Sequence, residues 1–397
     1  MWHFVRPVFI RTNCNIFSNG HQLKALDRTF RFRTFKTGTA KPKQGFSKVK
    51  IALIAAASGI TTGTVYSVYQ TNQQRTALLN PVQEKTITIL DKSPNVEITK
   101  KVRYPTDSSG LKIILFQYTT CPFCCKVRAF LDFYGISYDL VEVDSVFRQQ
   151  LKWTDYKKVP IVLVKVNDKY IQLNDSSMII SVLTSYLNDK EVSIEEVSNY
   201  YPSMSYVDDD GKIKKEILNR YYLMFQRSIA SESKNESLTQ ERKWRQWADE
   251  VLVHMLSPNV YRNTEEALQA FKWFSEVGEW EKNFNAVEAQ LVVYIGALAM
   301  WMIGKRLKKR HHLKDDVRLS LYEETNKWLK EVKKKGNQFH GGKNPDLADL
   351  AVFGVLNSIE GCNAFKDLLF NTNLGNWYSA MKEQIGNQAG TPLLVHR

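Results

Sequence analysis

The sequence Cys-Pro-Phe-Cys at residues 121–124 separates an apolar, strand-like run at residues 113–116 from a helix-like run at residues 126–134. The first turn of a helix has backbone N–H groups without partners, and these groups together with the helix dipole stabilise a thiolate. Because the thiolate is the nucleophilic form of cysteine, Cys121 is predicted to be the reactive sulfur. Cys124 follows one turn later on the same side, where it would assist or resolve that thiol. The alternative is a pair of inert, buried cysteines.

The segments around the cysteine pair predict a thioredoxin-like α/β domain. Residues 137–143, 161–166 and 170–173 have the composition of further strands. Val159-Pro160 lies just before the second of these segments, at the place where this fold has a cis proline facing the cysteine pair. An X-Pro bond is the only inexpensive place for a cis peptide. The backbone of Val159 would then be available to pair with an extended peptide.

A ligand site is predicted at the start of the next helix. Residues 174–177 read Asn-Asp-Ser-Ser and precede the apolar run 178–187, so Asp175 or Ser176 would cap a helix. A helix N-terminus attracts a carboxylate. Glutaredoxins and glutathione transferases hold glutathione in a similar way, with a backbone pair at Val159 for the cysteinyl part and Asp175 and Ser176 for the glutamyl end. The simpler alternative is that Asp175 is only a helix cap.

Charge and cysteine usage exclude some classes of protein. The net charge is +14, but residues 1–50 hold 11 Lys and Arg against one acid, Asp27, so the rest of the chain carries only 14 − 10 = +4. A nucleic-acid-binding surface is therefore not expected. The five cysteines lack the spacing of a disulfide framework, which indicates a reducing compartment. A metal site is not expected either, because the three clustered cysteines share one turn and have no histidine nearby.

The N-terminal part predicts targeting and attachment to a membrane. Residues 1–50 resemble a mitochondrial transit peptide or a disordered cytoplasmic tail. Residues 51–69 carry no charge and, at about 1.5 Å per residue, are long enough for one transmembrane helix. An interfacial helix and a removed sorting segment are the alternatives. Residues 70–108 read as a linker with weak strand character near residues 86–90 and 96–104.

The pattern changes to long amphipathic helices after the thioredoxin-like domain, which is expected at residues 109–190. With 397 residues, of which 43% are apolar, the chain can form two to three domains. Residues 191–212 read as a connecting segment and residues 213–397 as an all-helical domain. Asp346 and Asp349 predict a capping box like that of the central helix of glutathione transferases. Helical periodicity is clearest at residues 212–228, 240–256, 286–308 and 317–334.

Six motifs, spread over both predicted domains, share one resemblance. They are Tyr-Thr-Thr-Cys-Pro-Phe-Cys at 118–124, Lys-Val-Arg-Ala-Phe-Leu at 126–131, Lys-Val-Pro at 158–160, Gln-Leu-Asn-Asp-Ser-Ser at 172–177, Lys-Trp-Arg-Gln-Trp-Ala-Asp at 243–249 and Leu-Ser-Pro-Asn-Val-Tyr-Arg at 256–262. Together they resemble the membrane-associated prostaglandin E synthase type 2 family, from about Leu111 to the end of the helical domain. Cys125 departs from that family, in which a small polar residue such as Ser is expected. Residues 1–110 show no match.

The resemblance implies an isomerase that converts prostaglandin H2 to prostaglandin E2, built from a glutaredoxin-like domain and a glutathione-transferase-like helical domain. The Cys121 thiolate would engage the peroxide or a proton beside it and open the O–O bond without net redox change, with Cys124 as its partner. Tyr118 would donate its hydroxyl to the thiolate or to the developing oxyanion, and Phe123 would contact the lipid tail. The alternatives are that Tyr118 is a packing residue and Phe123 a flanking aromatic.

The resemblance also implies two cofactors. Glutathione would bind at Val159, Pro160, Asp175 and Ser176. Haem would bind with the glutathione sulfur on its iron and basic groups on its propionates, and haem-bound forms in the family are associated with breakdown of the endoperoxide. The positions that match the family's haem site are His254, Ser257, Arg306 and Arg310.

Two other functions fit the same residues. One is a glutathione-dependent thiol–disulfide oxidoreductase or glutathione transferase, in which Cys124 or Cys125 resolves a mixed disulfide on Cys121. The other is a non-catalytic haem or thiol sensor at a membrane. The expected partners are a lipid endoperoxide, a membrane and a second copy of the chain. The expected location is a Golgi or mitochondrial membrane, with a processed soluble cytoplasmic form as the alternative.

Overall fold

A computed structural model describes residues 82–84, 87–145, 147–207, 213–224, 232–283, 286–334 and 336–391. The basic segment expected at residues 1–50 and the transmembrane helix expected at residues 51–69 lie outside these ranges. Within them, every helix is too short or too polar to cross a membrane.

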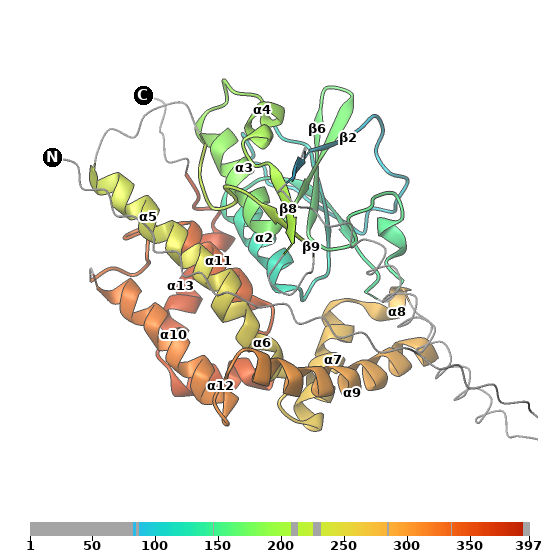
Figure 1. Cartoon of the computed structure of the whole chain (residues 1–397), viewed down its shortest axis with the longest axis vertical. Helices are drawn as coiled ribbons and strands as arrows, with labels where there is room; N and C mark the ends of the chain where they lie inside the picture. The colour runs from blue at the N-terminus through green and yellow to red at the C-terminus, as the bar shows by residue number, and fades with distance from the viewer. Residues whose placement is uncertain are drawn as a thin grey trace, which may run out of the picture. The chain divides into compact units, whose positions relative to one another are not determined.

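Four central strands build the main sheet (Figure 1). β4 (Ile113–Gln117) runs parallel to β5 (Tyr138–Glu142) and antiparallel to β6 (Ile161–Val166), which forms a hairpin with β7 (Lys169–Asn174). Side chains alternate along β4, so successive residues enter cores on opposite faces of the sheet. The predicted strands are therefore confirmed to within about two residues of their ends.

Two edge strands come from residues that the sequence predicted to be a linker. β2 (Thr88–Leu90) pairs with β7, and β3 (Lys100–Val102) pairs with β5, which gives the strand order β2-β7-β6-β4-β5-β3. A strand of three residues has no stability of its own and forms only against an existing sheet edge. The weak strand patterns were thus real, and residues 88–90 and 100–102 belong to the sheet rather than to a linker.

Two helices cover one face of the sheet. α2 (Pro122–Phe133) begins with a proline, whose missing N–H costs nothing at the first helical position. α3 (Ser176–Asn188) follows β7 directly and leads to the short α4 (Ile194–Asn199). The buried side chains of α2 and α3 share one core with the sheet. A 3-10 turn, η1 (Gln149–Leu151), lies between β5 and β6.

A strand of a second, small sheet occupies residues 213–217, where periodicity predicted a helix over residues 212–228; residues 212 and 225–228 of that prediction lie outside the described ranges. β8 (Ser203–Val207) pairs with β9 (Ile213–Ile217) and with β1 (Val82–Glu84). The prediction was wrong because β9 has apolar residues only at its two ends, four positions apart. That spacing fits one face of a helix and one face of a strand equally well, and pairing with β8 decides between them.

The helical domain, which was expected to begin at residue 213, consists of the described residues from 232 onward, shown in yellow to red in Figure 1. Its expected start is strand β9 instead. The predicted capping box is confirmed: Asp346 accepts the N–H of Asp349, and Asp349 accepts the N–H of Asp346. The elements are α5 (Glu232–Trp247), the π-helical turn η2 (Ala248–Leu252), α6 (Val253–Val260), α7 (Thr264–Val277), α8 (Trp280–Asn283), α9 (Ala286–Arg310), α10 (Val317–Lys333), α11 (Leu347–Asn357), α12 (Asn363–Asn371) and α13 (Leu374–Gly386).

The two domains meet where α11 packs on α2. The contact is close because Gly354 of α11 has no side chain: a Cβ there would lie 2.5 Å from the Lys126 Cα and 2.6 Å from the Lys126 backbone nitrogen. These are backbone atoms of a helix and cannot move aside independently. The helix that begins at the cysteine pair is therefore fixed against the second domain along its backbone.

Gly354→Ala is expected to lower the free energy of unfolding by about 1–3 kcal/mol, the usual cost of overpacking. Chemical denaturation measures it. The control is Gly375→Ala on α13, where a Cβ would meet no atom within 4 Å. That change should be neutral or stabilising by up to about 1 kcal/mol, because alanine favours helix over glycine. Equal effects of the two substitutions would contradict the close contact.

Candidate active site

Cys121 is the N-cap residue of α2, as predicted. Its backbone is extended, with φ −77° and ψ 124°, and its N–H donates to the Tyr118 carbonyl at 3.1 Å. Its side chain is partly exposed, whereas Cys124 and Cys125 are buried. Of the three clustered thiols, Cys121 alone is thus positioned to meet a substrate.

The thiols of Cys121 and Cys124 have opposite pKa shifts. The pKa of Cys121 is lowered chiefly by a hydrogen bond from the Cys124 thiol, and the backbone N–H groups of Phe123 and Cys124 and the charge of Arg128 act in the same direction against burial. Burial and the same contact with Cys121 raise the pKa of Cys124 well above its ordinary value. Cys121 is therefore the more readily ionised thiol of the pair, and Cys124 the one that holds its proton more tightly.

Cys124→Ala removes the largest cause of the lowered Cys121 pKa. Without that hydrogen bond the pKa of Cys121 should rise, so less of the thiol is ionised at a given pH. The profile of Cys121 alkylation against pH should therefore move to higher pH, and alkylation below neutral pH should slow severalfold. Iodoacetamide labelling read by mass spectrometry of the Cys121 peptide measures this. Cys362→Ala, which removes a buried thiol of the helical domain, is the control and should leave the profile unchanged. An unshifted profile in Cys124→Ala would argue against the hydrogen bond.

Cys125 is a structural thiol. Its Sγ donates to the Thr119 carbonyl at 3.3 Å and accepts from Arg128 Nη2 at 3.1 Å. Burial raises the pKa of Cys125 to about 11. A neutral, hydrogen-bonded thiol is a poor nucleophile, so these contacts disfavour the alternative in which Cys125 resolves a mixed disulfide.

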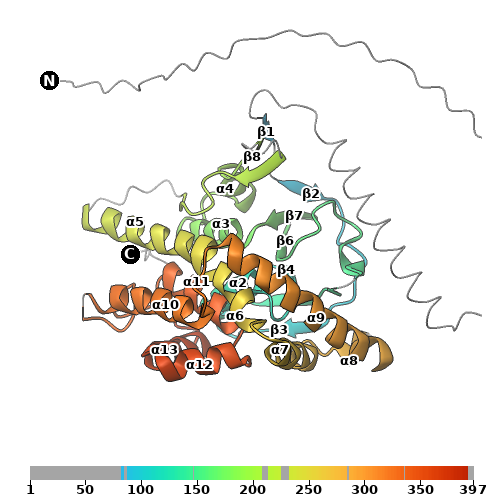
Figure 2. The same ribbon diagram turned by 60° about the horizontal axis from the view of Figure 1, so that its bottom comes forward.

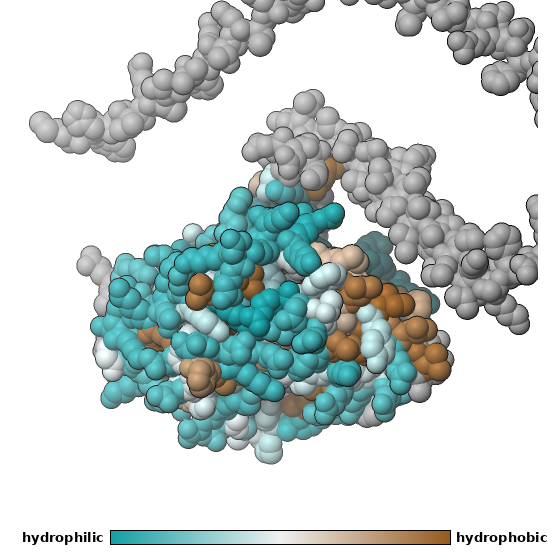
Figure 3. Space-filling model, turned by 90° about the horizontal axis from the view of Figure 1, so that it is seen from below, coloured by the Kyte–Doolittle hydropathy of each residue, from teal (hydrophilic) through white to brown (hydrophobic). Residues whose placement is uncertain are grey.

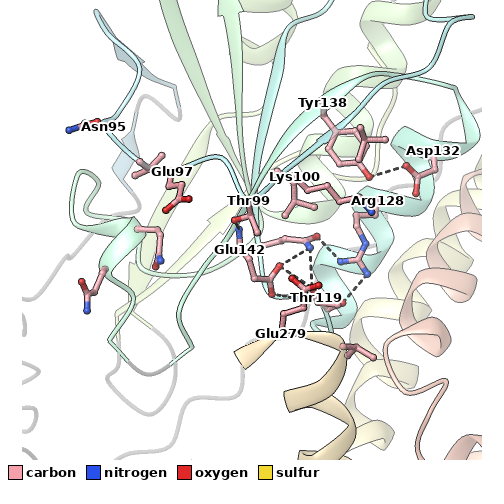
Figure 4. A pocket seen from close by; sticks show the side chains of 18 of the residues that line it. Asn95, Glu97, Thr99, Lys100, Thr119, Arg128, Asp132, Tyr138, Glu142 and Glu279 are labelled. Atoms are coloured by element: carbon pink, nitrogen blue, oxygen red, sulfur yellow. Dashed lines mark hydrogen bonds between the residues drawn. The ribbon is translucent and has the colours of Figure 1, made fainter. Parts of the chain in front are cut away.

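A polar cluster holds the loop that precedes Cys121. Glu142 accepts hydrogen bonds from the Thr119 backbone N–H at 2.6 Å and from the Thr119 hydroxyl at 2.9 Å. Arg128 donates to the Gln117 side chain at 2.6 Å and to the Thr119 carbonyl at 2.8 Å. Figure 4 shows these bonds converging on Thr119, two residues before the thiolate. Sequence analysis missed this cluster, because nothing along the chain links residues so far apart.

A cavity of about 990 Å³ borders the polar cluster (Figure 4). It lies against the β3–β5 edge of the sheet and the turn after α7. Cys121 does not line it, so this cavity adjoins the support of the loop rather than the thiolate. Its charged lining residues are Glu97, Lys100, Arg128, Asp132, Glu142 and Glu279.

Tyr118 and Phe123 lie near the thiolate. Burial raises the pKa of the Tyr118 hydroxyl, and the charges of Cys121 and Cys124 add to this effect, against Arg148. No hydrogen bond joins the Tyr118 hydroxyl to the Cys121 sulfur in the described part of the chain. Phe123 is partly buried against the main core. Their catalytic roles remain predictions.

The Val159–Pro160 peptide bond is cis, as predicted. Within the described ranges, neither the N–H nor the C=O of Val159 has a hydrogen-bond partner, because β6 begins only at Ile161. Backbone groups of this kind need partners from outside the chain. They suit an extended peptide such as glutathione.

Asp175 and Ser176 lie at the start of α3, and both already accept hydrogen bonds from other groups of the protein. The Asp175 Oδ1 accepts from the N–H groups of Ser177 at 2.9 Å and Met178 at 3.1 Å. Its Oδ2 lies 3.6 Å from the Arg220 guanidinium. Ser176 is buried, and its hydroxyl accepts from Lys126 Nζ at 3.3 Å. Asp175 is therefore a helix cap whose second oxygen can still accept from a ligand.

A buried ion pair connects this helix start with the second domain. Lys126 is 1% exposed, pairs with Asp249 of η2 and donates to the Ser177 hydroxyl at 2.9 Å. Asp249 also accepts from the hydroxyls of Ser177 at 2.6 Å and Tyr221 at 3.2 Å. Burial alone would raise the pKa of Asp249, but the Lys126 ammonium and these hydrogen bonds hold it below its ordinary value.

Sequence reasoning missed this pair, because a lysine in a helix is normally exposed. The available signal was the motif at residues 243–249, whose last two residues, Ala248 and Asp249, begin the π-helical turn. Such turns occur often at functional sites.

The four positions expected to hold haem lie on two helices in contact. His254 and Ser257 are on α6, and Arg306 and Arg310 are on α9. The His254 ring stacks on His311 with centroids 4.4 Å apart. His254 and both arginines are exposed. Exposed guanidinium groups suit the carboxylates of haem, but they suit other anions equally well, so the donor set does not single out haem.

The chain is similar to known proteins over both domains. The family model described as Glutaredoxin matches residues 113–171. Prostaglandin E synthase 2 of Mus musculus is 49% identical over 280 residues, which cover 70% of this chain and 71% of that protein. The chain belongs to the prostaglandin E synthase 2 family. The Danio rerio member is 46% identical over 277 residues, 69% of this chain and 71% of that protein. The resemblance drawn from the six motifs is thereby confirmed.

Similarity to solved structures does not strengthen the assignment to the prostaglandin E synthase 2 family. Human glutathione transferase theta-2, in complex with glutathione and an unknown ligand, aligns over 70% of this chain and 84% of that chain. The sequence identity is 14% and the TM-score is 0.39. A TM-score this low does not establish a common fold.

Proposed function

We propose that this chain is an isomerase that converts prostaglandin H2 to prostaglandin E2. The observation that carries the proposal is 46–49% identity, across both domains, with relatives named prostaglandin E synthase 2. The site supports it, because the thiolate at Cys121 is partly exposed and has a protonated thiol, Cys124, directly beside it.

The reaction moves one proton and breaks one O–O bond without net oxidation. Cys121 as base takes the proton from the carbon that bears one peroxide oxygen, and the freed electron pair forms the ketone. The O–O bond breaks, and the second oxygen leaves as an alkoxide. A proton from the thiol now on Cys121, or from the Tyr118 hydroxyl beside it, converts that alkoxide to the alcohol. Phe123 would contact the lipid tail at the same helix start.

Glutathione is the proposed cofactor. The unpaired backbone of Val159, held by the cis bond to Pro160, would bind its cysteinyl part. The Oδ2 of Asp175 and the Ser176 hydroxyl would bind its glutamyl end, near the ammonium of Lys126. When bound, glutathione would supply a further thiol near Cys121, besides that of Cys124.

A thiol–disulfide oxidoreductase is the second candidate. The observation that favours it is the lowered pKa of Cys121, which suits this thiol to attack a disulfide, together with the contact between the Cys121 and Cys124 thiols, which leaves a second sulfur within reach of the mixed disulfide. A haem-bound form that breaks the endoperoxide down is a finer proposal and rests on His254, Ser257, Arg306 and Arg310. Attachment to a Golgi or mitochondrial membrane and formation of a homodimer are also part of the proposal.

The test is product analysis with the full chain in lipid vesicles, given prostaglandin H2 with and without glutathione and haem. We expect prostaglandin E2 to form faster than in buffer with empty vesicles. A parallel assay follows thiol–disulfide exchange on a small disulfide with glutathione. Products identical to buffer together with rapid exchange would replace the isomerase with the oxidoreductase. Breakdown products that appear only with haem would support the haem-bound form.

A further inference from the structure

The loop between β5 and β6 carries an arginine near the reactive thiol to which the proposed reaction gives no role. Arg148 is exposed and precedes η1, in the blue-green loop on the flank of the main sheet away from α5 (Figure 2). Exposed cations are common on this protein, and the face in Figure 3 is mostly hydrophilic, so exposure alone does not mark a site. Arg148 is distinguished by its backbone and by its contacts.

The backbone of Arg148 is held in an unusual conformation. It is left-handed, with φ 50° and ψ 41°, which is uncommon for a residue that has a side chain. Its N–H donates to the Asp144 carbonyl at 3.0 Å, and its carbonyl accepts from the Leu151 N–H at 2.9 Å. Such conformations persist where the surroundings fix them, and they cluster at ligand sites. The backbone that carries this guanidinium is therefore fixed by the fold.

The rest of the loop is anchored as well. Trp153 packs on Phe116 of β4, with ring centroids 5.1 Å apart, and its Nε1 donates to the Gln150 carbonyl at 2.7 Å. Lys157 Nζ donates to the Leu151 carbonyl at 2.8 Å, so this ammonium is engaged within the loop. The loop is thus ordered before any ligand arrives, which lowers the entropy that binding would cost.

The Arg148 guanidinium contacts two segments that border the reactive thiol. Its Nη1 donates to the Lys157 carbonyl at 3.0 Å, two residues before Val159. Burial raises the pKa of the Tyr118 hydroxyl, and the charge of Arg148 and a hydrogen bond from it oppose that rise. The charge of Cys121 acts on the same hydroxyl. Arg148 therefore lies at the edge of the site, with Tyr118 between it and the thiol.

Most of the hydrogen-bonding capacity of this guanidinium is unused. It has five N–H donors, and its contacts within the protein are a carbonyl and a neutral hydroxyl. Among the residues that the structure describes, Arg148 has no carboxylate partner. A guanidinium suits a carboxylate well, because two parallel N–H groups match the two oxygens. The free donors thus offer a carboxylate site beside Tyr118.

We propose that Arg148 binds the carboxylate of the lipid acid substrate and thereby selects the free acid over its esters. The inference rests on the proposed isomerase function, because prostaglandin H2 carries a carboxylate at the end of one apolar chain. A charge-assisted pair with Arg148 fixes that end of the chain while the endoperoxide lies at Cys121. Arg148 is a residue of specificity and takes no part in the chemistry.

The first test compares prostaglandin H2 with its methyl ester, which keeps the endoperoxide but lacks the charge. The KM of the parent for the acid should be at least about 10-fold below that for the ester, the usual value of a hydrogen bond to a charged group. Arg148→Met should abolish this ratio, and Arg148→Lys should restore part of it. Lys152→Met removes an exposed cation from the same loop and should keep the ratio. A purely structural effect would change both substrates alike and leave the ratio intact, which would contradict the proposal.

The second test measures binding without turnover and so separates this inference from the proposed function. Prostaglandin E2 keeps the carboxylate chain, and protection of Cys121 from iodoacetamide reports its binding. The acid should protect the parent at a concentration at least about 10-fold lower than its methyl ester does, and Arg148→Met should remove the difference. Equal protection by acid and ester in the parent would overturn the inference, whatever the rate of isomerisation. A preference for the acid in a parent that forms no prostaglandin E2 would support the Arg148 site and reject the isomerase.

Glutathione is the other source of a carboxylate, because its glycyl end would lie near the same loop if its cysteinyl part paired with Val159. Calorimetry of the parent and of Arg148→Met with glutathione alone distinguishes the two. We expect the two affinities to agree within about threefold. A loss of about 10-fold or more, together with an unchanged preference for the lipid acid, would assign Arg148 to glutathione and overturn the proposal.

Discussion

Cys121→Ser is expected to slow the formation of prostaglandin E2 by at least about 100-fold. A serine hydroxyl stays protonated at neutral pH and cannot act as the base, whereas the structure lowers the pKa of the Cys121 thiol through Cys124 and the start of α2. The measurement is the initial rate with prostaglandin H2 under saturating glutathione, corrected for the reaction in buffer.

The matched control is Cys125→Ser, four residues away on the same helix. A serine there can donate to the Thr119 carbonyl and accept from Arg128 as the thiol does, so the rate should stay within about threefold of the parent. Thermal unfolding of both variants separates loss of chemistry from loss of fold. If Cys121→Ser keeps the parent's rate, the thiolate is not the catalytic group.

Asp249→Asn is expected to lower the free energy of unfolding by about 3–5 kcal/mol, because it leaves a buried lysine without a counter-charge. Lys126 is 1% exposed, and Asp249 is its only ion-pair partner in the described part of the chain. In the folded protein the pKa of Asp249 lies below its ordinary value. The ion pair therefore stabilises the fold fully at pH values above the ordinary pKa, and this contribution is lost as the pH falls through the folded pKa. Denaturant titration at neutral and acidic pH measures both effects.

A surface ion pair provides the comparison. Lys314 and Glu323 are each about half exposed, at 52% and 54%, so Glu323→Gln should cost at most about 1 kcal/mol. Lys126→Met combined with Asp249→Leu should cost less than the sum of the single changes, since neither charge then remains unpaired. An Asp249→Asn variant as stable as Glu323→Gln would show that water reaches Lys126.

The sequence by itself determined the order of elements in the first domain and the place of its cysteine pair at the start of a helix. The strands around residues 113–174, the cysteine pair at the start of a helix and the proline before β6 are local patterns, and each follows from the preferences of neighbouring residues. The same holds for the capping box of Asp346 and Asp349, which is made by residues three positions apart. Family membership could also be predicted, because each of the six motifs is an unbroken stretch of the chain.

Only the tertiary structure decided the features that depend on distant partners. β2 and β3 are too short to form without the sheet edges of β7 and β5, and β9 reads as a helix until it pairs with β8. The environment of Cys125, the polar support of Thr119 and the pairing of Lys126 with Asp249 join residues from 3 to 123 positions apart. Burial and a low local dielectric set the charge states of these groups, and burial is a property of packing that no stretch of neighbouring residues determines.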